Sequence, residues 1–421
     1  MHILSSAPAQ EAPTCWAEDF GPFQDAQGTR IWLNAAHQGP LPRVAAAEAR
    51  RALEWKLAPH RISDDAFVEV PRRLRELLAR VSGAPAEEII LGNSASHGLN
   101  VLANALPWRR GDEVLVMASD FPATIFPWFA AERHGVRVRQ LRLQEPLLRP
   151  EQLQNELRPN TRVVCLSWVQ ALSGYALDLG GLGRACAEAG VLFVVNATQG
   201  LGSRPLDIGR LPAAAVTSSG FKWLCGPYAT GFCWIRPDVL EALEPIQAYW
   251  LALPDGAALD LDREGEHRPR RGLGARAYDV FGTANFLNFM PWAAAVQYLL
   301  EQGIEQIAAH DAALASRLAA GLEASDFRVL SPTAADERSA ITVISHRDAS
   351  RNGQVFRTLS DSGIDAAMRG GNIRFSPHLY NTAAEIDLAL ETLKSGASRR
   401  YRPAPLTPPS YATCPGWWPP P

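Results

Sequence analysis

One lysine of the chain lies in an apolar, glycine-rich stretch, a setting in which lysine can act as a nucleophile. The stretch Ser218–Pro227 reads SSGFKWLCGP and follows a strand-like run. A lysine on a loop is usually a solvated surface charge. Desolvation among apolar neighbours would instead lower the pKa of Lys222 and free its amine to form an imine. The pattern therefore predicts a buried and chemically active Lys222.

Three further segments place small or polar residues directly after strand-like runs, at Leu91–Gly98, Ser119–Thr124 and Val194–Gly200. In an open α/β sheet the ligand binds outside the carboxyl ends of the strands, so we expect these segments to surround one site. Small residues such as Ala95 and Ser96 at the start of a helix leave backbone amides free for a phosphate. An ordinary helix cap would look the same.

The elements that must position these segments alternate between helix-like and strand-like patterns. Most strand-like runs are continuously apolar, which is typical of a sheet covered on both faces. They are mostly separated by helix-length stretches such as Ala123–His134 and Leu182–Ala189. One run alternates with arginine and is expected at an edge. The sequence thus predicts an α/β fold with a largely parallel sheet, whose expected strands include Glu113–Met117, Val136–Leu141 (the edge strand), Val163–Trp168, Val191–Val195, Ala214–Thr217 and Gly231–Ile235.

Changes in pattern along the chain indicate its domain organisation. Residues 1–28 show little periodicity and are expected to form an N-terminal arm, and 29–61 to contribute to a small domain and to the active site. Residues 62–290 are predicted to form the large domain. Long helices with few strands follow, so 291–400 are predicted to form a smaller α+β domain. Residues 401–421 are rich in proline and are expected to be a tail.

Composition and charge argue against several classes of protein. The 421 residues are 47% apolar, and Lys plus Arg number 41 against 44 Asp plus Glu, so no basic excess suggests nucleic acid. No apolar run approaches the roughly 18 residues of a membrane span, and the start of the chain lacks a secretory signal pattern. Six cysteines without a CxxC pair argue against a disulfide framework or a zinc site. We therefore expect a cytoplasmic protein without membrane partner or metal.

Taken together and in this order, these segments resemble the class V aminotransferase group of pyridoxal-phosphate (PLP) enzymes, which includes cysteine desulfurases, kynureninase and isopenicillin N epimerase-like proteins. The resemblance covers about residues 30–395 and is strongest to the isopenicillin N epimerase-like branch. It implies the PLP-dependent transferase fold type I, PLP as cofactor, and a homodimer with active sites at the subunit interface.

The resemblance also implies roles for individual residues. Ser219-Gly220-Phe221-Lys222 is similar to the family's Ser-Gly-His-Lys, which makes Lys222 the Schiff-base lysine. Phe121 would stack on the cofactor ring, and Gly282-Thr283 would reach the phosphate across the dimer interface. The residues expected to bind the cofactor are Ala95, Ser96, Phe121, Gln170, Asn196, Gln199, Ser219, Lys222, Gly282 and Thr283.

Substrate recognition is implied for two arginines near the C-terminal end of the matching region. The segment Ile373–His378 is similar to the family stretch whose arginine clamps the substrate carboxylate, which assigns that role to Arg374. A planar guanidinium suits a carboxylate, so Arg374 would select free α-amino acids. Arg369 is a second candidate anchor. His37 lies in the N-terminal active-site segment and is either a general acid or a histidine with only structural hydrogen bonds.

Three departures from the family pattern bear on the reaction. Asn196 replaces the aspartate beneath the pyridine nitrogen, so the ring would be a weaker electron sink; alternatively the amide only preserves geometry. Phe221 replaces a phosphate-binding histidine. No cysteine lies between Asp361 and Pro377, from which we expect that the protein is not a cysteine desulfurase.

The expected activity is that of a PLP-dependent enzyme acting on an L-α-amino acid or a metabolite that carries one. After the substrate forms an external aldimine, Lys222 would remove the Cα proton. Side-chain elimination by a lyase is slightly preferred because of Asn196. The alternatives are a class V aminotransferase or epimerase, and a catalytically inert PLP-fold binding or scaffold protein.

Overall fold

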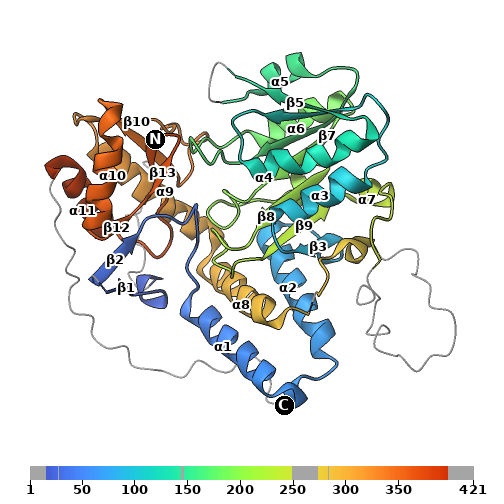
Figure 1. The fold of residues 1–421 in the computed structure, drawn as a ribbon, viewed down its shortest axis with the longest axis horizontal. Coiled ribbons are helices and arrows are strands. Elements are labelled where there is room, and N and C mark those ends of the chain that lie inside the picture. Colours follow the sequence, from blue (N-terminus) through green and yellow to red (C-terminus); the bar gives the residue numbers. More distant parts are fainter. Residues whose placement is uncertain (1–15, 27, 144–146, 249–273, 283, 397–421) are drawn as a thin grey trace, which may run out of the picture.

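A seven-stranded mixed sheet lies at the centre of the larger part of the molecule (Figure 1). The computed structural model describes residues 16–26, 28–143, 147–248, 274–282 and 284–396. Six of the seven strands run in one direction, and only β9 is antiparallel to its neighbours. The strand order is β3 (Ile89–Gly92), β9 (Gly231–Ile235), β8 (Ala215–Ser219), β7 (Leu192–Asn196), β6 (Thr161–Ser167), β4 (Glu113–Met117) and β5 (Arg137–Leu141).

Both faces of this sheet are buried, as the continuous apolar runs predict. In β4, Val114 and Val116 enter one hydrophobic cluster, whereas Leu115 and Met117 enter the cluster on the opposite face. This alternation follows from the period of two along a strand. The helices of this part are α2 (Ala66–Ser82), α3 (Ala95–Ala105), α4 (Pro122–Ile125), α5 (Pro150–Glu156), α6 (Leu179–Glu188) and α7 (Pro237–Glu241).

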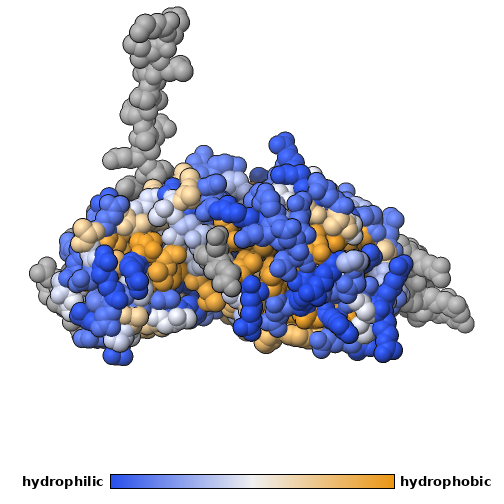
Figure 2. Space-filling view, turned by 90° about the horizontal axis from the view of Figure 1, so that it is seen from above, coloured by the Kyte–Doolittle hydropathy of each residue, from blue (hydrophilic) through white to orange (hydrophobic). Residues whose placement is uncertain are grey.

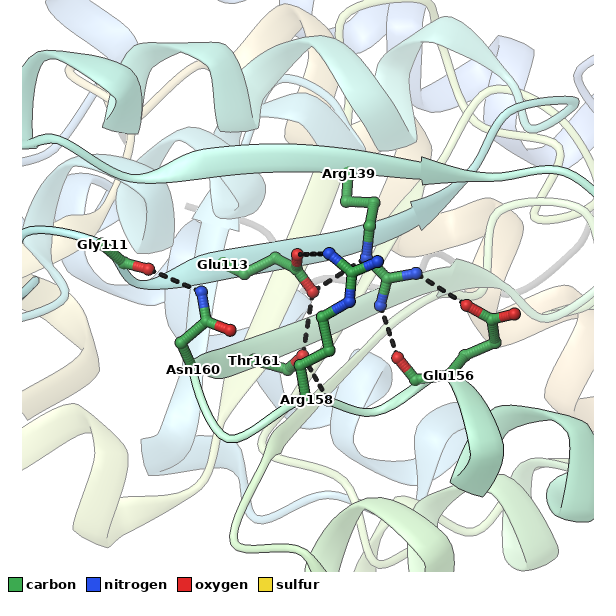
Figure 3. A network of polar contacts seen from close by, with 7 residues as sticks. All are labelled: Gly111, Glu113, Arg139, Glu156, Arg158, Asn160 and Thr161. Carbon is green, nitrogen blue, oxygen red and sulfur yellow. Dashed lines mark hydrogen bonds and ion pairs between the residues drawn. The ribbon is translucent and has the colours of Figure 1, made fainter.

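The edge position expected for the arginine-alternating strand is confirmed, because β5 pairs only with β4 among the described residues. Arg139 of β5 reaches the buried carboxylate of Glu113 at 3.0 Å and the carboxylate of Glu156 at 2.7 Å. Thr161, at the start of β6, donates its hydroxyl to the same Glu113 carboxylate at 2.9 Å. Figure 3 shows this network, which ties the edge strand to its neighbours at the amino ends of the strands, away from the expected site.

The smaller part of the molecule contains a four-stranded antiparallel sheet with the order β10 (Phe327–Val329), β11 (Thr342–His346), β14 (Asn372–Phe375) and β13 (Ala367–Arg369). Packed around it are α9 (Ile304–Gly321), α10 (Asn352–Asp361) and α11 (Ala383–Ser395) (Figure 1). A further sheet joins β1 (Phe23–Asp25) and β2 (Gly28–Trp32) to β12 (Ile364–Asp365). The N-terminal segment therefore belongs structurally with the C-terminal one.

Two long helices, α1 (Arg43–Leu57) and α8 (Phe286–Gln302), connect the larger and the smaller part of the molecule. Helix α8 packs against α1 and α2. The domain boundary expected between 290 and 291 lies inside α8, which continues through Pro291. A proline removes one backbone hydrogen bond and often kinks a helix. In α8 the apolar neighbours Phe289 and Trp292 are fully buried, and their packing holds the helix in place.

One expected helix needs correction, and three expectations concern residues outside those that the structure describes. The helix expected at Ala123–His134 is the short α4 followed by a 3-10 helix at Phe126–His134, since Pro127 cannot donate the backbone hydrogen bond that would extend α4. Most of the arm at 1–28, the tail at 401–421 and Thr283 lie outside the described residues. Among the described helices, none is both long and apolar enough to cross a bilayer.

Candidate active site

Lys222 lies three residues after the end of β8 and only 7% of its surface is exposed, which confirms the expected burial. The loop around it depends on glycine: a Cβ at Gly220 or Gly226 would come within 2.4 Å of the buried Trp292 ring. Burial first, and then the nearby Arg374 and Arg369, together lower the pKa of Lys222 from 10.5 to about 7. Its amine is therefore largely uncharged just above neutral pH, as a nucleophile or proton acceptor must be.

An aromatic ring lies beside this amine. Phe121 precedes α4, after β4, and is 44% exposed, which is high for a phenylalanine in a folded core. The Nζ atom of Lys222 lies 5.1 Å from the centroid of the Phe121 ring and 5.9 Å from that of Phe221. A partly exposed ring next to the lysine has a free face on which a planar cofactor can stack.

The carboxyl end of β7 carries Asn196, which is 4% exposed and hydrogen bonded on both sides. Its amide Nδ2 donates to the Thr124 hydroxyl at 2.9 Å, and its Oδ1 accepts the backbone N–H of Thr198 at 3.1 Å. The Thr124 hydroxyl lies 2.9 Å from that of Ser167, which donates to Asp120 at 2.6 Å. The sequence placed Asp120 and Thr124 in the segment after β4, but nothing local indicates that they meet Ser167 of β6 and Asn196 of β7.

The start of α3 is fastened to the end of β8. The backbone N–H of Ala95 donates to the Ser219 hydroxyl at 3.0 Å, and the Thr217 hydroxyl donates to the Ala95 carbonyl at 2.8 Å. The Ser219 N–H in turn donates to the Thr198 hydroxyl at 3.1 Å. These bonds place Ser96, in the first turn of α3, at the same sheet edge as Lys222, where the amino end of a helix favours an anionic group.

The two glutamines expected near the cofactor both bond to other parts of the protein. Gln199 accepts the indole N–H of Trp223 at 2.9 Å and donates to the Ala36 carbonyl at 3.0 Å. Gln170 donates to the Ser167 carbonyl at 3.3 Å. Gln199 thereby links the N-terminal segment to the loop of Lys222, whereas direct contact of either glutamine with the cofactor stays a prediction.

Two arginines reach the site from the antiparallel sheet. Arg374 of β14 is 2% exposed; one of its Nη atoms donates to the Ala171 carbonyl at 3.0 Å, and its buried Nε has no partner among the described residues. Burial, with Arg369 next, lowers the pKa of Arg374 to about 10. Because Ala367 pairs with Arg374 across the two strands, Arg369 lies on the same face as Arg374. This face can bind an anion.

His37 also faces these cations. Its pKa is lowered by burial first, and then by Arg369, Arg374 and Lys222. A neutral imidazole in this setting can accept a proton near the substrate and give it up again once protonated. The structure thus brings together four of the expected site residues, which are His37, Lys222, Arg369 and Arg374. Gly282 lies in an exposed loop, next to Thr283 outside the described residues.

A buried ion pair behind the lysine loop was missed by sequence reasoning. His378 is fully buried, with Nδ1 2.8 Å from the carboxylate of Asp311 in α9 and Nε2 3.0 Å from the Trp223 carbonyl. Burial opposes its charged form, but Asp311 raises the pKa of His378 to about 10. The imidazolium therefore donates on both sides and ties the smaller part of the molecule to the residue next to Lys222. The sequence signal that could have revealed this pair is Asp311, an aspartate on the apolar face of a helix, where an unpaired charge is rarely buried.

These residues fit a PLP cofactor: a buried amine with a lowered pKa, a half-exposed ring beside it, and a buried guanidinium with an unused donor. A model of the aminotransferase class-V family matches residues 34–388. The chain belongs to this family. Its fold is accordingly the PLP-dependent transferase fold type I, and pyridoxal phosphate is its cofactor.

The class V relatives include enzymes with different names. A probable cysteine desulfurase of Methanothermobacter thermautotrophicus is 26% identical over 394 residues, covering 86% of this chain and 94% of the relative. An isopenicillin N epimerase of Streptomyces clavuligerus is 28% identical over 382 residues, covering 87% and 94%. A solved structure of a C-DES mutant, with glycine covalently linked to the PLP cofactor, has a TM-score of 0.80 at 23% identity and covers 90% of this chain and 98% of its own. That likeness shows the fold.

The expectation that the protein is not a cysteine desulfurase is wrong, because the sequence does not exclude that activity. Four class V relatives carry the name probable cysteine desulfurase, including the archaeal one just described. The expectation relied on a single stretch, Asp361 to Pro377, that contains no cysteine. One missing side chain in one stretch does not test the steps that depend on the lysine and the cofactor, which class V enzymes share.

Proposed function

We propose that this class V enzyme removes the α-proton of an L-α-amino acid and then cleaves a bond in the side chain. The observation that carries the proposal is Lys222, whose buried amine has a pKa of about 7 and lies in the same site as Arg374. An amine with this pKa is ready at neutral pH both to bind a carbonyl group and to take up a proton.

The side chains of the site divide the work of binding and proton transfer. Arg374 has an unused Nε donor and is proposed to bind the substrate carboxylate, with Arg369 on the same face as a second anchor. A carboxylate held there fixes how the bonds to Cα are oriented. Lys222 Nζ takes the Cα proton, and His37 is proposed to take up a proton and pass it to the leaving group.

Asn196 favours cleavage of the side chain. Bound PLP supplies an electron sink for negative charge at Cα, and a neutral amide cannot strengthen that sink as a carboxylate does. Amino transfer and epimerisation require prolonged stabilisation of negative charge at Cα. Loss of a side-chain leaving group relieves that charge at once, so it depends less on the strength of the sink.

A sulfur-bearing amino acid is the first substrate to test. Relatives 26% to 28% identical are named probable cysteine desulfurases, and C-DES, which shares the fold, is described as a cystine C–S lyase. Sulfur on Cβ is a good leaving group once the neighbouring Cα carries negative charge. We therefore propose cysteine or cystine as substrate. Isopenicillin N epimerase relatives make epimerisation the second candidate, and it would leave the side chain intact.

We further propose that the protein works as a homodimer in the cytoplasm. Gly282, beside Thr283, is expected to reach the partner's cofactor, and it lies in a loop where a Cβ would meet nothing within 4 Å. The neighbouring Phe281 is 61% exposed. A reducing compartment suits the buried free thiols of the described residues, which are Cys165, Cys186, Cys225 and Cys233.

The proposal is tested by incubating the PLP-loaded protein with a panel of L-amino acids that includes cysteine, cystine, alanine and aspartate. From cysteine or cystine we expect the elimination products, which are pyruvate, ammonia and a sulfur species, to exceed the keto acid that keeps the sulfur-bearing side chain and is formed by amino transfer. Borohydride reduction followed by peptide mapping should locate the cofactor on Lys222. Racemised substrate as the main product would favour the epimerase, and no product with any amino acid would overturn the proposal.

The carboxylate role of Arg374 has its own variant. Arg374→Leu should retain PLP but lose about 30- to 1000-fold in kcat/KM, on the order of 2–4 kcal/mol for a buried charged contact. Arg369→Leu is the matched change on the same face and should cost less. PLP content of each variant, read from its absorbance, shows whether the site is still folded. An unchanged kcat/KM for Arg374→Leu would mean that the carboxylate binds elsewhere.

A further inference from the structure

The orientation of the Asn196 amide is set by a group that can only donate. The backbone N–H of Thr198 lies 3.1 Å from Oδ1, so the carbonyl oxygen of the side chain faces Thr198 and the NH₂ group faces the other way. One N–H of Nδ2 goes to the Thr124 hydroxyl at 2.9 Å. An amide nitrogen carries two hydrogens, and the described residues provide no partner for the second. Asn196 therefore has an N–H donor left for a ligand.

A buried carboxylate sets the direction of the hydrogen bonds behind Asn196. Asp120 accepts the hydroxyl of Ser167 at 2.6 Å and the Ser167 backbone N–H at 2.8 Å. Because the Ser167 proton goes to Asp120, the Ser167 oxygen accepts from the Thr124 hydroxyl, 2.9 Å away. The Thr124 oxygen is then free to accept from Asn196. All four side chains are less than 10% exposed, so water does not replace these partners.

Counting protons shows that this chain of hydrogen bonds has a proton for every link only when residue 196 is an amide. The chain has three links, from Asn196 to Thr124, from Thr124 to Ser167 and from Ser167 to Asp120, and it has three protons to fill them. A carboxylate at 196 would leave two protons for the same three links and would place a second buried charge near Asp120. Burial already raises the pKa of Asp120 above its ordinary value. Unfilled links between buried polar groups are costly.

We propose that Asp120, Ser167 and Thr124 are positioning residues that hold the Asn196 amide as a hydrogen-bond donor to the pyridine nitrogen of PLP. A donor at this position requires an acceptor lone pair, so the bound cofactor has an unprotonated ring nitrogen. Asn196 is then an integrated part of the site and not a neutral replacement. This inference rests on the cofactor and not on which bond of the substrate is cleaved.

The spectroscopic test uses the full-length protein loaded with PLP that is isotope-labelled at the pyridine nitrogen. Nitrogen NMR distinguishes a protonated from an unprotonated ring. We expect the unprotonated shift in the wild type and in Ser167→Ala, and a move toward the protonated shift in Asn196→Asp. A protonated ring nitrogen in the wild type would overturn the proposal, whatever the amino-acid panel shows.

The proton count is tested by a double-mutant cycle on thermal unfolding, measured with and without PLP. In the wild type, Ser167→Ala leaves the Thr124 hydroxyl without its acceptor and should lower the midpoint by several degrees. In an Asn196→Asp background the Thr124 hydroxyl can turn to the new carboxylate, so Ser167→Ala should cost little or raise the midpoint. Asn160→Asp is the control background, since Asn160 donates to the Gly111 carbonyl and takes no part in the hydrogen bonds of Asn196 (Figure 3). In that background the losses in unfolding midpoint from the two substitutions should add. If the costs also add in the Asn196→Asp background, Ser167, Thr124 and Asn196 are not linked by the proposed hydrogen bonds.

Discussion

At the scale of single residues, the reactivity of this site comes from the removal of water around charges. Lys222 is one of three cationic side chains that face one another, and two of the three, Lys222 and Arg374, are more than nine-tenths buried. Desolvation and mutual repulsion both favour the uncharged amine. The same arrangement can bind an anion, since a negative charge at Arg374 would relieve part of the repulsion.

The lowered pKa of Lys222 predicts how stability depends on pH. Between about 7 and 10.5 the folded state keeps Lys222 neutral while the unfolded state binds a proton, so the free energy of unfolding rises with pH in this window. The slope from this one residue is at most about 1.4 kcal/mol per pH unit. In protein freed of PLP, Lys222→Met should remove this pH-dependent contribution to the free energy of unfolding. The substitution should therefore stabilise the protein most near pH 7 and progressively less toward pH 10.

Denaturant unfolding of the wild type and Lys222→Met at several pH values measures that difference. Arg72→Met serves as a control, because Arg72 is an exposed cation on α2, far in sequence from the site. A stability difference between the wild type and Lys222→Met that stays constant with pH would show that the amine is charged in the folded protein.

At the scale of elements, the site depends on how closely the N-terminal segment approaches the lysine loop. The N–H of Gly39 donates to the Phe221 carbonyl at 2.9 Å, and a Cβ on Gly39 would lie 1.9 Å from the backbone oxygen of Lys222. No backbone atom can yield by that much without moving the loop. Glycine at position 39 is therefore required by contact and not by backbone angles.

Gly39→Ala is expected to push the N-terminal segment away from the lysine loop. The overlap should lower the unfolding midpoint by several degrees and weaken PLP retention, because His37 and Lys222 are displaced together. Gly353→Ala, in α10, is the control: its Cβ would meet only the end of the Arg357 side chain at 3.8 Å, and alanine is the better helix former. Equal midpoints and equal PLP content for the two variants would contradict the close contact.

At the scale of the whole molecule, hydrophobic surface suggests an interface. Figure 2 shows hydrophobic residues gathered in continuous areas along the middle of one face, between charged surroundings. Among the described residues, large apolar side chains that are exposed include Phe121, Phe126, Phe129, Tyr228 and Phe281. Exposed aromatic side chains in such numbers are typical of a surface that another chain covers.

We therefore predict that the PLP-loaded protein is a two-fold dimer. Light scattering should give twice the 45.9 kDa of one chain. Phe126→Glu, at a side chain that is 65% exposed, should shift the mass toward the monomer and weaken PLP retention if that ring lies in the interface. Leu57→Glu, at the exposed end of α1, is a second substitution of an exposed apolar residue for comparison. A monomer that binds PLP tightly would rule out shared active sites.

The sequence by itself determined the fold class, the family and the burial of Lys222. Apolar runs separated by helix-length stretches report local periodicity, and local periodicity is what distinguishes a buried parallel sheet from other folds. The position of Lys222 directly after such a run, among small and apolar residues, was enough to predict that it is buried. The resemblance to the class V family likewise identified Asn196, where the family has an aspartate, as a departure.

Only the tertiary structure decided what these residues contact. Asp120 and Thr124 lie in one segment after β4, whereas Ser167 and Asn196 end β6 and β7, and strand order and register bring the four together. In the same way, His378 and Asp311 meet behind the lysine loop. The direction of a hydrogen bond between buried side chains depends on which donors and acceptors face each other. That is set by packing across strands, and no local pattern in the sequence contains it.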